Sequence, residues 1–332
     1  MISSLSRVFI SLVLILLLGA GGWFASYVFT PAPGSELVKV VIPRGAGVRS
    51  IKTILGRKGI IKDDVRFLVL ARLTRESRLL PAGEFMVPRG LTPPEVLQFL
   101  VTAKPVQYRV VIPEGWIIPQ IAAAFARNDL IDPRLFISLC RDREFIRSLG
   151  MKQESLEGYL FPDTYTLVRD EVDEKSLITM MVKRFKDVWN KLDKPQNLPF
   201  SQHEVVTLAS IVEKETGSAG ERSKIASVFY NRLRKGMRLQ SDPTTIYGLQ
   251  EFDGNLTRAD LNRKTPYNTY VIKGLPPGPI CSPGRAALDA VLHPASEHYY
   301  YFVSKNDGSH FFSRTLKEHN RAVRKYQKKH SR

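Results

Sequence analysis

The chain is organised around the stretch Leu208-Ala-Ser-Ile-Val-Glu-Lys-Glu-Thr-Gly217, in which an apolar helix face runs into two carboxylates. Ser201 and Glu204 form a capping box ahead of this stretch, so that each side chain satisfies an otherwise unpaired backbone amide. Gly217 is placed to end the helix, because glycine commonly follows the last helical turn. We therefore predict a helix that begins after Ser201 and carries both carboxylates in its last turn.

The two carboxylates, Glu213 and Glu215, differ little in their expected surroundings. At about 100° per residue, Glu215 points between Leu208 and Ile211. Apolar neighbours disfavour the charged form of a carboxyl group and raise its pKa, as a general acid near neutral pH requires. Glu213 faces a similar pair of apolar side chains, so helical angle alone does not separate the two. A solvated helix end without chemistry is the other interpretation.

Composition and charge restrict the class of partner. The chain has 332 residues, a net charge of +17 and an isoelectric point near 9.9, which favours an anionic partner. No zinc-ligand spacing or RNA-binding aromatic motif is present, so we do not expect nucleic acid.

Cys140 and Cys281 are too few for a disulfide framework. They form either one bridge in an oxidising compartment or two ordinary apolar fillers, and we favour the second.

The N-terminal region predicts a membrane anchor. Val8 to Phe29 is a run of 22 residues without a charge, and about 20 apolar residues span the hydrocarbon core of a bilayer. A cleaved signal peptide is the alternative, but its apolar region is shorter, about 7–15 residues. Arg7 precedes the run, so the positive-inside rule places the N-terminus in the cytoplasm and the rest of the chain in the periplasmic or extracytoplasmic space. Trp23 and Tyr27 suit the outer interface of a single-pass inner-membrane protein.

An internal near-repeat follows the anchor. Val40–Gly45 recurs as Val110–Gly115, and each copy precedes the pattern of two short helices, so we predict a strand and two helices in each. A further strand at 82–87 and a helix at 92–102 complete a small αβ module. Pro31–Ser35 reads as a short, stiff linker between the anchor and this module. The fold class is α+β, with an anchor at 1–30, a module at 31–105 and a larger mixed α/β catalytic domain at 106–332.

Several local patterns in the C-terminal half predict helix starts and a hairpin. Ser218 with Glu221 and Thr315 with Glu318 read as capping boxes, and Ser282-Pro283 reads as another helix start. Asn306-Asp307-Gly308 predicts a hairpin between β-rich runs. An aromatic run, Tyr159, Phe161 and Tyr165, either lines a sugar groove or packs in the core.

The candidate catalytic groups in the sequence are carboxylates. No Gly-rich phosphate loop, zinc-type His/Cys cluster or Gly-x-Ser-x-Gly elbow is present, and no cofactor or metal is expected. Carboxylates with polar and aromatic neighbours fit cleavage of a glycosidic bond, for which the usual scheme needs two of them. The available carboxylates are Glu213 and Glu215, with Glu157, Asp163, Glu221 and Asp242 as companions.

Four motifs in the same order resemble the endolytic murein transglycosylases of the MltG/YceG-like type. They are Leu208–Gly217, Glu221–Leu233, Met237–Thr244, and Tyr267–Tyr270 with Gly274–Gly278. The resemblance covers nearly the whole chain, including the anchor and a segment similar to a LysM-like module. In that family the catalytic acid is a glutamate in the Glu-Lys-Glu-Thr segment, and lytic transglycosylases more widely place a Glu-Ser pair at a helix end. Glu215-Thr216 matches that pair with Thr for Ser, which implies Glu215.

The resemblance implies cleavage of the bond between N-acetylmuramic acid and N-acetylglucosamine in nascent strands without water. Protonated Glu215 would donate to the glycosidic oxygen and then help the C6 hydroxyl attack C1, leaving a 1,6-anhydro end that terminates elongation. The implied partners are peptidoglycan glycan strands, the cytoplasmic membrane and cell-wall synthases. The residues we expect to contact substrate are Glu213, Glu157, Gln240, Asp242, Tyr267 and Asn268.

Two other functions stay open at this point. One is a two-carboxylate muramidase, in which Glu215 pairs with Glu157 or Asp242 and water enters the product. The other is a membrane-tethered scaffold that binds peptidoglycan without turnover. The mass of the product separates the first from the transglycosylase, and any strand cleavage by the purified protein excludes the second.

Overall fold

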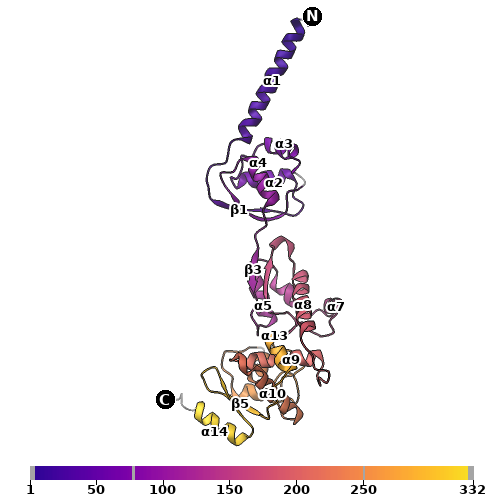
Figure 1. Ribbon diagram of the computed structural model, residues 1–332, viewed down its shortest axis with the longest axis vertical. Helices are drawn as coiled ribbons and strands as arrows, with labels where there is room; N and C mark the ends of the chain where they lie inside the picture. Colours follow the sequence, from indigo (N-terminus) through magenta and orange to yellow (C-terminus); the bar gives the residue numbers. More distant parts are fainter. Residues whose placement is uncertain (1–3, 77–78, 250, 328–332) are drawn as a thin grey trace. The chain divides into compact units, whose positions relative to one another are not determined.

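The computed structural model describes residues 4–76, 79–249 and 251–327 (Figure 1). The chain divides into two compact units. The first comprises Met1–Arg109 with Thr166–Val172, and the second comprises Val110–Tyr165 with Asp173–Arg332. Both contain helices together with short strands, which gives a mixed α/β protein with one N-terminal apolar helix, in agreement with the expected α+β class.

The first unit is built on one antiparallel strand pair. β1 (Leu37–Ile42) pairs with β2 (Gly83–Pro88), with Leu37 opposite Pro88 and Ile42 opposite Gly83. Between them in sequence come α2 (Val48–Arg57) and α3 (Arg66–Leu73), and α4 (Pro93–Thr102) follows β2. These elements share one apolar core, which confirms the strand and helices predicted after the anchor. Its fully buried members include Val40, Leu55, Phe67, Phe85 and Leu97.

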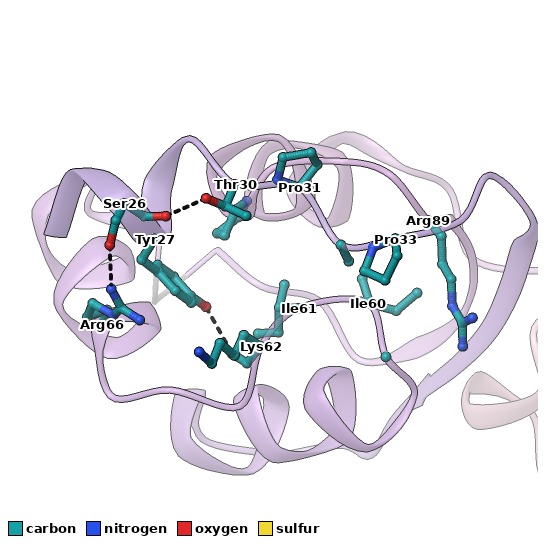
Figure 2. A pocket seen from close by; sticks show the side chains of 13 residues that line it. Ser26, Tyr27, Thr30, Pro31, Pro33, Ile60, Ile61, Lys62, Arg66 and Arg89 are labelled. Atoms are coloured by element: carbon teal, nitrogen blue, oxygen red, sulfur yellow. Dashed lines mark hydrogen bonds between the residues drawn. The ribbon is translucent and has the colours of Figure 1, made fainter. Parts of the chain in front are cut away.

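The N-terminal helix α1 (Ser4–Val28) is long and apolar enough to cross a membrane between Arg7 and Val28. Its last turn is part of the module, because Tyr27 is only 3% exposed in the module core. Arg66 of α3 donates to the Trp23 carbonyl oxygen at 2.6 Å. It also donates to the hydroxyl of Ser26 at 3.0 Å (Figure 2). The helix end therefore packs directly on the module.

This packing corrects the expectation that residues 31–35 form a stiff spacer between anchor and module. Pro31 and Pro33 instead line a cavity of about 540 Å³ together with the end of α1, Ile60 and Arg89 (Figure 2). The apolar Tyr27 ring is buried against the module, so no gap is left for a spacer to cross.

The near-repeat predicts the local fold correctly in both copies. β3 (Tyr108–Val111), α5 (Ile118–Ala126) and α6 (Pro133–Leu139) repeat the strand and two helices of β1, α2 and α3. Gly45 and Gly115 turn the chain after the two strands with φ of 76° and 77°, a left-handed conformation that glycine adopts without steric cost. β4 (Thr164–Leu167) pairs with β3, as β2 pairs with β1.

The remaining helices of the second unit include α9 (Gln202–Glu215). The others are α7 (Arg143–Ser148), α8 (Glu174–Lys191), α10 (Arg222–Arg234), α11 (Asp242–Gly248), α12 (Arg258–Asn262), α13 (Arg285–Leu292) and α14 (Leu316–Tyr326). α9 begins at the predicted capping box, and every residue from Val205 to Val212 is buried. It packs against α10, α11 and α13. A helix buried on all sides carries its last residue, Glu215, to a fixed position.

The predicted hairpin and final helix are confirmed. β5 (Tyr301–Ser304) and β6 (His310–Ser313) are antiparallel and joined through Asn306–Gly308. Thr315 and Glu318 form the capping box of α14. The aromatic run resolves to core packing, since Tyr159, Phe161 and Tyr165 are at most 6% exposed.

The predicted end of α9 is confirmed, because its last residue is Glu215, Thr216 is its extended cap and Gly217 follows directly. Two predicted helix starts are wrong for physical reasons. The capping box expected at Ser218 is absent, because the carboxylate of Glu221 accepts hydrogen bonds from His310 instead. α13 begins after Gly284 rather than at Ser282, whose backbone is paired with the turn at residues 115–116.

Candidate active site

Glu215 is the last residue of α9, and its carboxyl group lies deep among protein atoms although the residue as a whole is half-buried. Burial is the largest influence on this group and raises the pKa of Glu215 to about 7. The negative charge of Asp242 raises the pKa further, whereas the hydrogen bond from Ser241 and the charge of Arg232 lower it. A group poised in this way can both give and take a proton near neutral pH.

The hydroxyl of Ser241 donates to Glu215 Oε1 at 2.5 Å. Among the residues that the structure describes, it is the one side chain that hydrogen-bonds this carboxyl group. Ser241 is itself fixed by Thr269, whose hydroxyl accepts its backbone amide at 3.0 Å. The hydroxyl groups of Thr244 and Thr269 are hydrogen-bonded to each other at 2.7 Å. The Thr244 hydroxyl also donates to the Ser241 carbonyl oxygen at 2.6 Å. Two buried threonines thus hold the serine that holds the catalytic candidate.

Arg232 of α10 supplies a buried positive charge close to Glu215. It is 8% exposed, donates from Nε to the Tyr300 carbonyl oxygen and from Nη1 to that of Leu239, both at 2.6 Å. Arg232 lies three residues after the core residue Phe229, and this spacing puts it on the buried face of α10.

Glu215 and Arg232 line one cavity of about 470 Å³ in the second unit. Of the residues expected to contact substrate, Gln240 and Asp242 line it as well. The Tyr270 hydroxyl donates to Asp242 Oδ1 at 2.6 Å, which fixes an otherwise exposed carboxylate. The other lining residues come from the hairpin and α14, and include Tyr301, Phe302, His310, Leu316 and His319.

Glu213 has a different environment from Glu215, although the sequence barely separates them. Its Oε2 accepts the Gly284 backbone amide at 2.9 Å, and its Oε1 accepts from Arg222 at 3.3 Å. Gly284 is the cap residue of α13, so the carboxylate stabilises the first turn of that helix. The side chain of Glu213 is 7% exposed, so its contacts in the structure are with the protein, and contact with substrate stays a prediction.

The side chain of Asn268 is likewise bonded within the protein. It is fully buried, its amide donates to the carbonyl oxygens of Asp260, Leu261 and Arg263, and its Oδ1 accepts from Thr245. Every hydrogen-bonding position of the side chain is therefore used within the protein. Asn268 therefore holds the loop that follows α12, and its contact with substrate stays a prediction.

The last two expected contacts, Glu157 and Tyr267, lie together in another cavity of about 560 Å³. The structure therefore does not bring Glu157 beside Glu215 in one cavity, and Asp242 is the remaining companion for a two-carboxylate reaction. Asp163 pairs instead with Arg184 at 2.6 Å.

Across the described ranges, no group of three His, Cys, Asp or Glu side chains is arranged to hold a metal ion.

These features define a class of site: one buried carboxyl group at a helix end, held by a hydroxyl and facing a cavity lined with tyrosines and an arginine. Such a site suits general acid–base attack on a neutral polar substrate, as in glycosidic bond cleavage. The sequence agrees, since the model of the YceG-like family matches residues 40–325. The chain belongs to this family.

Two relatives of the chain support its membership of this family. The chain is 34% identical over 305 residues to the endolytic murein transglycosylase of Bacillus subtilis strain 168, covering 87% of this chain and 84% of that one. It is 29% identical over 350 residues to the protein of the same name from Streptococcus pneumoniae strain D39, covering 94% of this chain and 63% of the relative.

A solved structure has the same fold. The crystal structure of a YceG-like protein from Listeria monocytogenes superposes with a TM-score of 0.58 at 34% identity, covering 86% of this chain and 98% of that chain.

Proposed function

We propose that this protein is an endolytic murein transglycosylase that cleaves the bond between N-acetylmuramic acid and N-acetylglucosamine within peptidoglycan strands. The single observation that carries the proposal is Glu215, whose buried carboxyl group has a pKa raised to about 7 and opens on a cavity of about 470 Å³. Near neutral pH such a group is partly protonated and so available as an acid, which an ordinary surface glutamate is not.

The reaction uses one residue in two roles. Protonated Glu215 gives its proton to the glycosidic oxygen as the bond to C1 breaks. The carboxylate that results accepts the hydroxyl hydrogen bond of Ser241 and faces the charge of Arg232. It then removes the proton of the C6 hydroxyl as that oxygen attacks C1. The product is a 1,6-anhydro ring with no water added, so a second catalytic carboxylate is not needed.

The two-carboxylate muramidase is the alternative with a specific observation behind it, because Asp242 lines the same cavity as Glu215. We favour the transglycosylase, since Asp242 is engaged by the Tyr270 hydroxyl at 2.6 Å. The deciding experiment is mass analysis of products from purified glycan strands. Anhydro ends support the proposal; a mass gain of one water per cut identifies a muramidase, and no cut at all leaves a binding scaffold.

We infer that this activity lies at the inner membrane, with the folded part in the periplasm. The support is the apolar span from Arg7 to Val28, with a positive charge at its start. Protease added to spheroplasts then digests the folded part. Complete protection while the inner membrane is intact contradicts this topology.

The first unit is a LysM-like module that positions substrate. One support is the order strand, helix, helix, strand, in which the two strands pair. The other is that the cavity lined by Glu215 belongs to the second unit. Deleting residues 36–105 should reduce action on polymeric strands while some turnover remains. Total loss of turnover by a folded catalytic unit contradicts an accessory role. A synthase that extends strands at the same membrane is the protein partner we infer.

A further inference from the structure

The cavity that holds Glu157 is separate from the one that holds Glu215, and the reaction above does not use it. Its volume is about 560 Å³. Its lining includes the turn Pro277–Pro279, Pro266 with Tyr267, and His203 of α9. Residues 152–155 also line it, and their one lysine and one glutamate add no net charge.

Glu157 is a buried carboxyl group with half of its hydrogen-bonding capacity unused. It is 5% exposed. Its Oε2 accepts the Ile118 amide and the Tyr247 hydroxyl, both at 3.3 Å, whereas its Oε1 has no partner among the described residues. An unsatisfied buried polar atom is costly and is rare in folded proteins. A ligand that offers a hydroxyl or an amide would satisfy it.

The walls of this cavity are held in place before any ligand arrives. His203 Nε2 donates to the Pro277 carbonyl oxygen at 2.9 Å, so its Nδ1 accepts the Tyr159 hydroxyl at 2.7 Å. The rings of Tyr247 and Tyr267 meet edge to face with centroids 4.8 Å apart. Proline-stiffened loops and locked rings reduce the entropy that binding must overcome.

The two cavities share their flanking segments. Asp242, at the start of α11, lines the Glu215 cavity, and Tyr247, near the end of the same helix, hydrogen-bonds Glu157. These residues are about 7 to 8 Å apart along the helix axis at 1.5 Å per residue. The loop after α12 does the same, because Tyr267 lines the Glu157 cavity and Tyr270 the Glu215 cavity. The two cavities are therefore bordered by the same two segments of the chain.

We propose that the Glu157 cavity binds an N-acetylated sugar unit of the same glycan strand whose scissile bond lies at Glu215. The inference rests on the proposed function and adds a second, distal binding site to it. An aromatic ring beside an unpaired carboxyl oxygen fits a sugar, which has an apolar ring face and hydroxyl and acetamido groups around it.

A neutral ligand suits this cavity better than the cationic side chain of a stem peptide. Burial raises the pKa of Glu157 to about 7, so much of the group is uncharged at neutral pH. A cation would require the carboxyl group to ionise against the desolvation that raises its pKa. An uncharged carboxyl group can instead donate to a carbonyl oxygen and accept from a hydroxyl.

The test measures how the length of the strand affects the kinetics of full-length protein in detergent. Peptide-free strands are compared with the shortest strands that the protein still cleaves. Glu157→Met keeps the volume and removes the hydrogen bonds, and Tyr267→Ala removes the ring. Asp187→Asn, an exposed carboxyl-to-amide change on α8, is the matched control. Thermal unfolding checks that each variant is folded.

The expected result is a KM for long strands raised about tenfold in both variants, with kcat unchanged and short strands unaffected; tenfold is on the order of one lost hydrogen bond or stacking contact. An unchanged KM for long strands overturns the inference, as does an equal loss for both lengths. So does a defect seen only with peptide-bearing strands, which would identify a peptide site. In each of these cases wild-type protein still forms anhydro ends, so the proposed function is judged separately.

Discussion

Removing the hydroxyl of Ser241 should change the pH dependence of the reaction in a direction that the geometry fixes. This hydroxyl donates to Glu215 at 2.5 Å and favours the ionised form. A hydrogen bond to a charged group contributes roughly 1.5–3 kcal/mol, and about 1.4 kcal/mol corresponds to one pH unit in a pKa. In Ser241→Ala the acid therefore stays protonated to higher pH, and the alkaline limb of kcat/KM moves up by about one pH unit or more.

The assay is the rate of anhydro-end formation across the pH range for wild type and Ser241→Ala. Activity near pH 6 should also fall, because the carboxylate formed in the second half of the reaction loses its stabilising partner. Ser148→Ala, in which the lost hydroxyl only donates to the Phe145 carbonyl oxygen on the surface helix α7, should leave the profile unchanged. An alkaline limb that stays in place, or moves to lower pH, would refute the assignment of Ser241 as the partner of the catalytic acid.

Three further changes test other parts of the structure. Glu213→Gln should lower the melting temperature, since it weakens the hydrogen bond to the Gly284 amide, and should reduce kcat only modestly; unchanged stability contradicts its packing role. Glu157→Gln should raise stability relative to wild type more at pH 8 than at pH 5. The reason is that the folded pKa of about 7 lies above the ordinary value of 4.5, so wild-type stability falls as pH rises between them. A difference independent of pH contradicts this. Arg66→Ala should loosen the end of α1 by removing the bond to Trp23, seen as a changed Trp23 fluorescence spectrum; an identical spectrum contradicts the docking.

Local signals in the sequence predict much of the fold. The capping boxes at Ser201 and Thr315 and the turn at Gly308 involve neighbours a few residues apart, so their chemistry is visible in the sequence. The duplicated Pro-x-Gly turns are equally local. The failure at Ser218 shows the limit. The carboxylate that should have completed its capping box, Glu221, bonds His310, which lies 89 residues away.

The active site is only partly predictable for the same reason. Glu215 is proposed from its motif, but Ser241, its hydrogen-bond partner, is 26 residues away and directly precedes α11. The helical angle predicts nearly the same apolar surroundings for the side chains of Glu213 and Glu215. What separates them is the tertiary contact of Glu213 with Gly284, 71 residues further on. Spacing along one helix cannot reveal which carboxylate meets a neighbouring helix and which meets a cavity.

The central claim is that the carboxyl group of Glu215 moves the proton in both halves of the reaction. The most direct test is the rate of 1,6-anhydro product formation by Glu215→Gln, with Glu213→Gln as the matched control on the same helix turn. Gln keeps the size and hydrogen-bonding shape of Glu but cannot transfer the proton, and general acid–base catalysis typically contributes about 10²–10⁴-fold. We expect a folded Glu215→Gln protein with turnover lower by at least that factor, while Glu213→Gln stays active. Near wild-type anhydro formation by Glu215→Gln, or a dead Glu213→Gln beside an active Glu215→Gln, would contradict the claim.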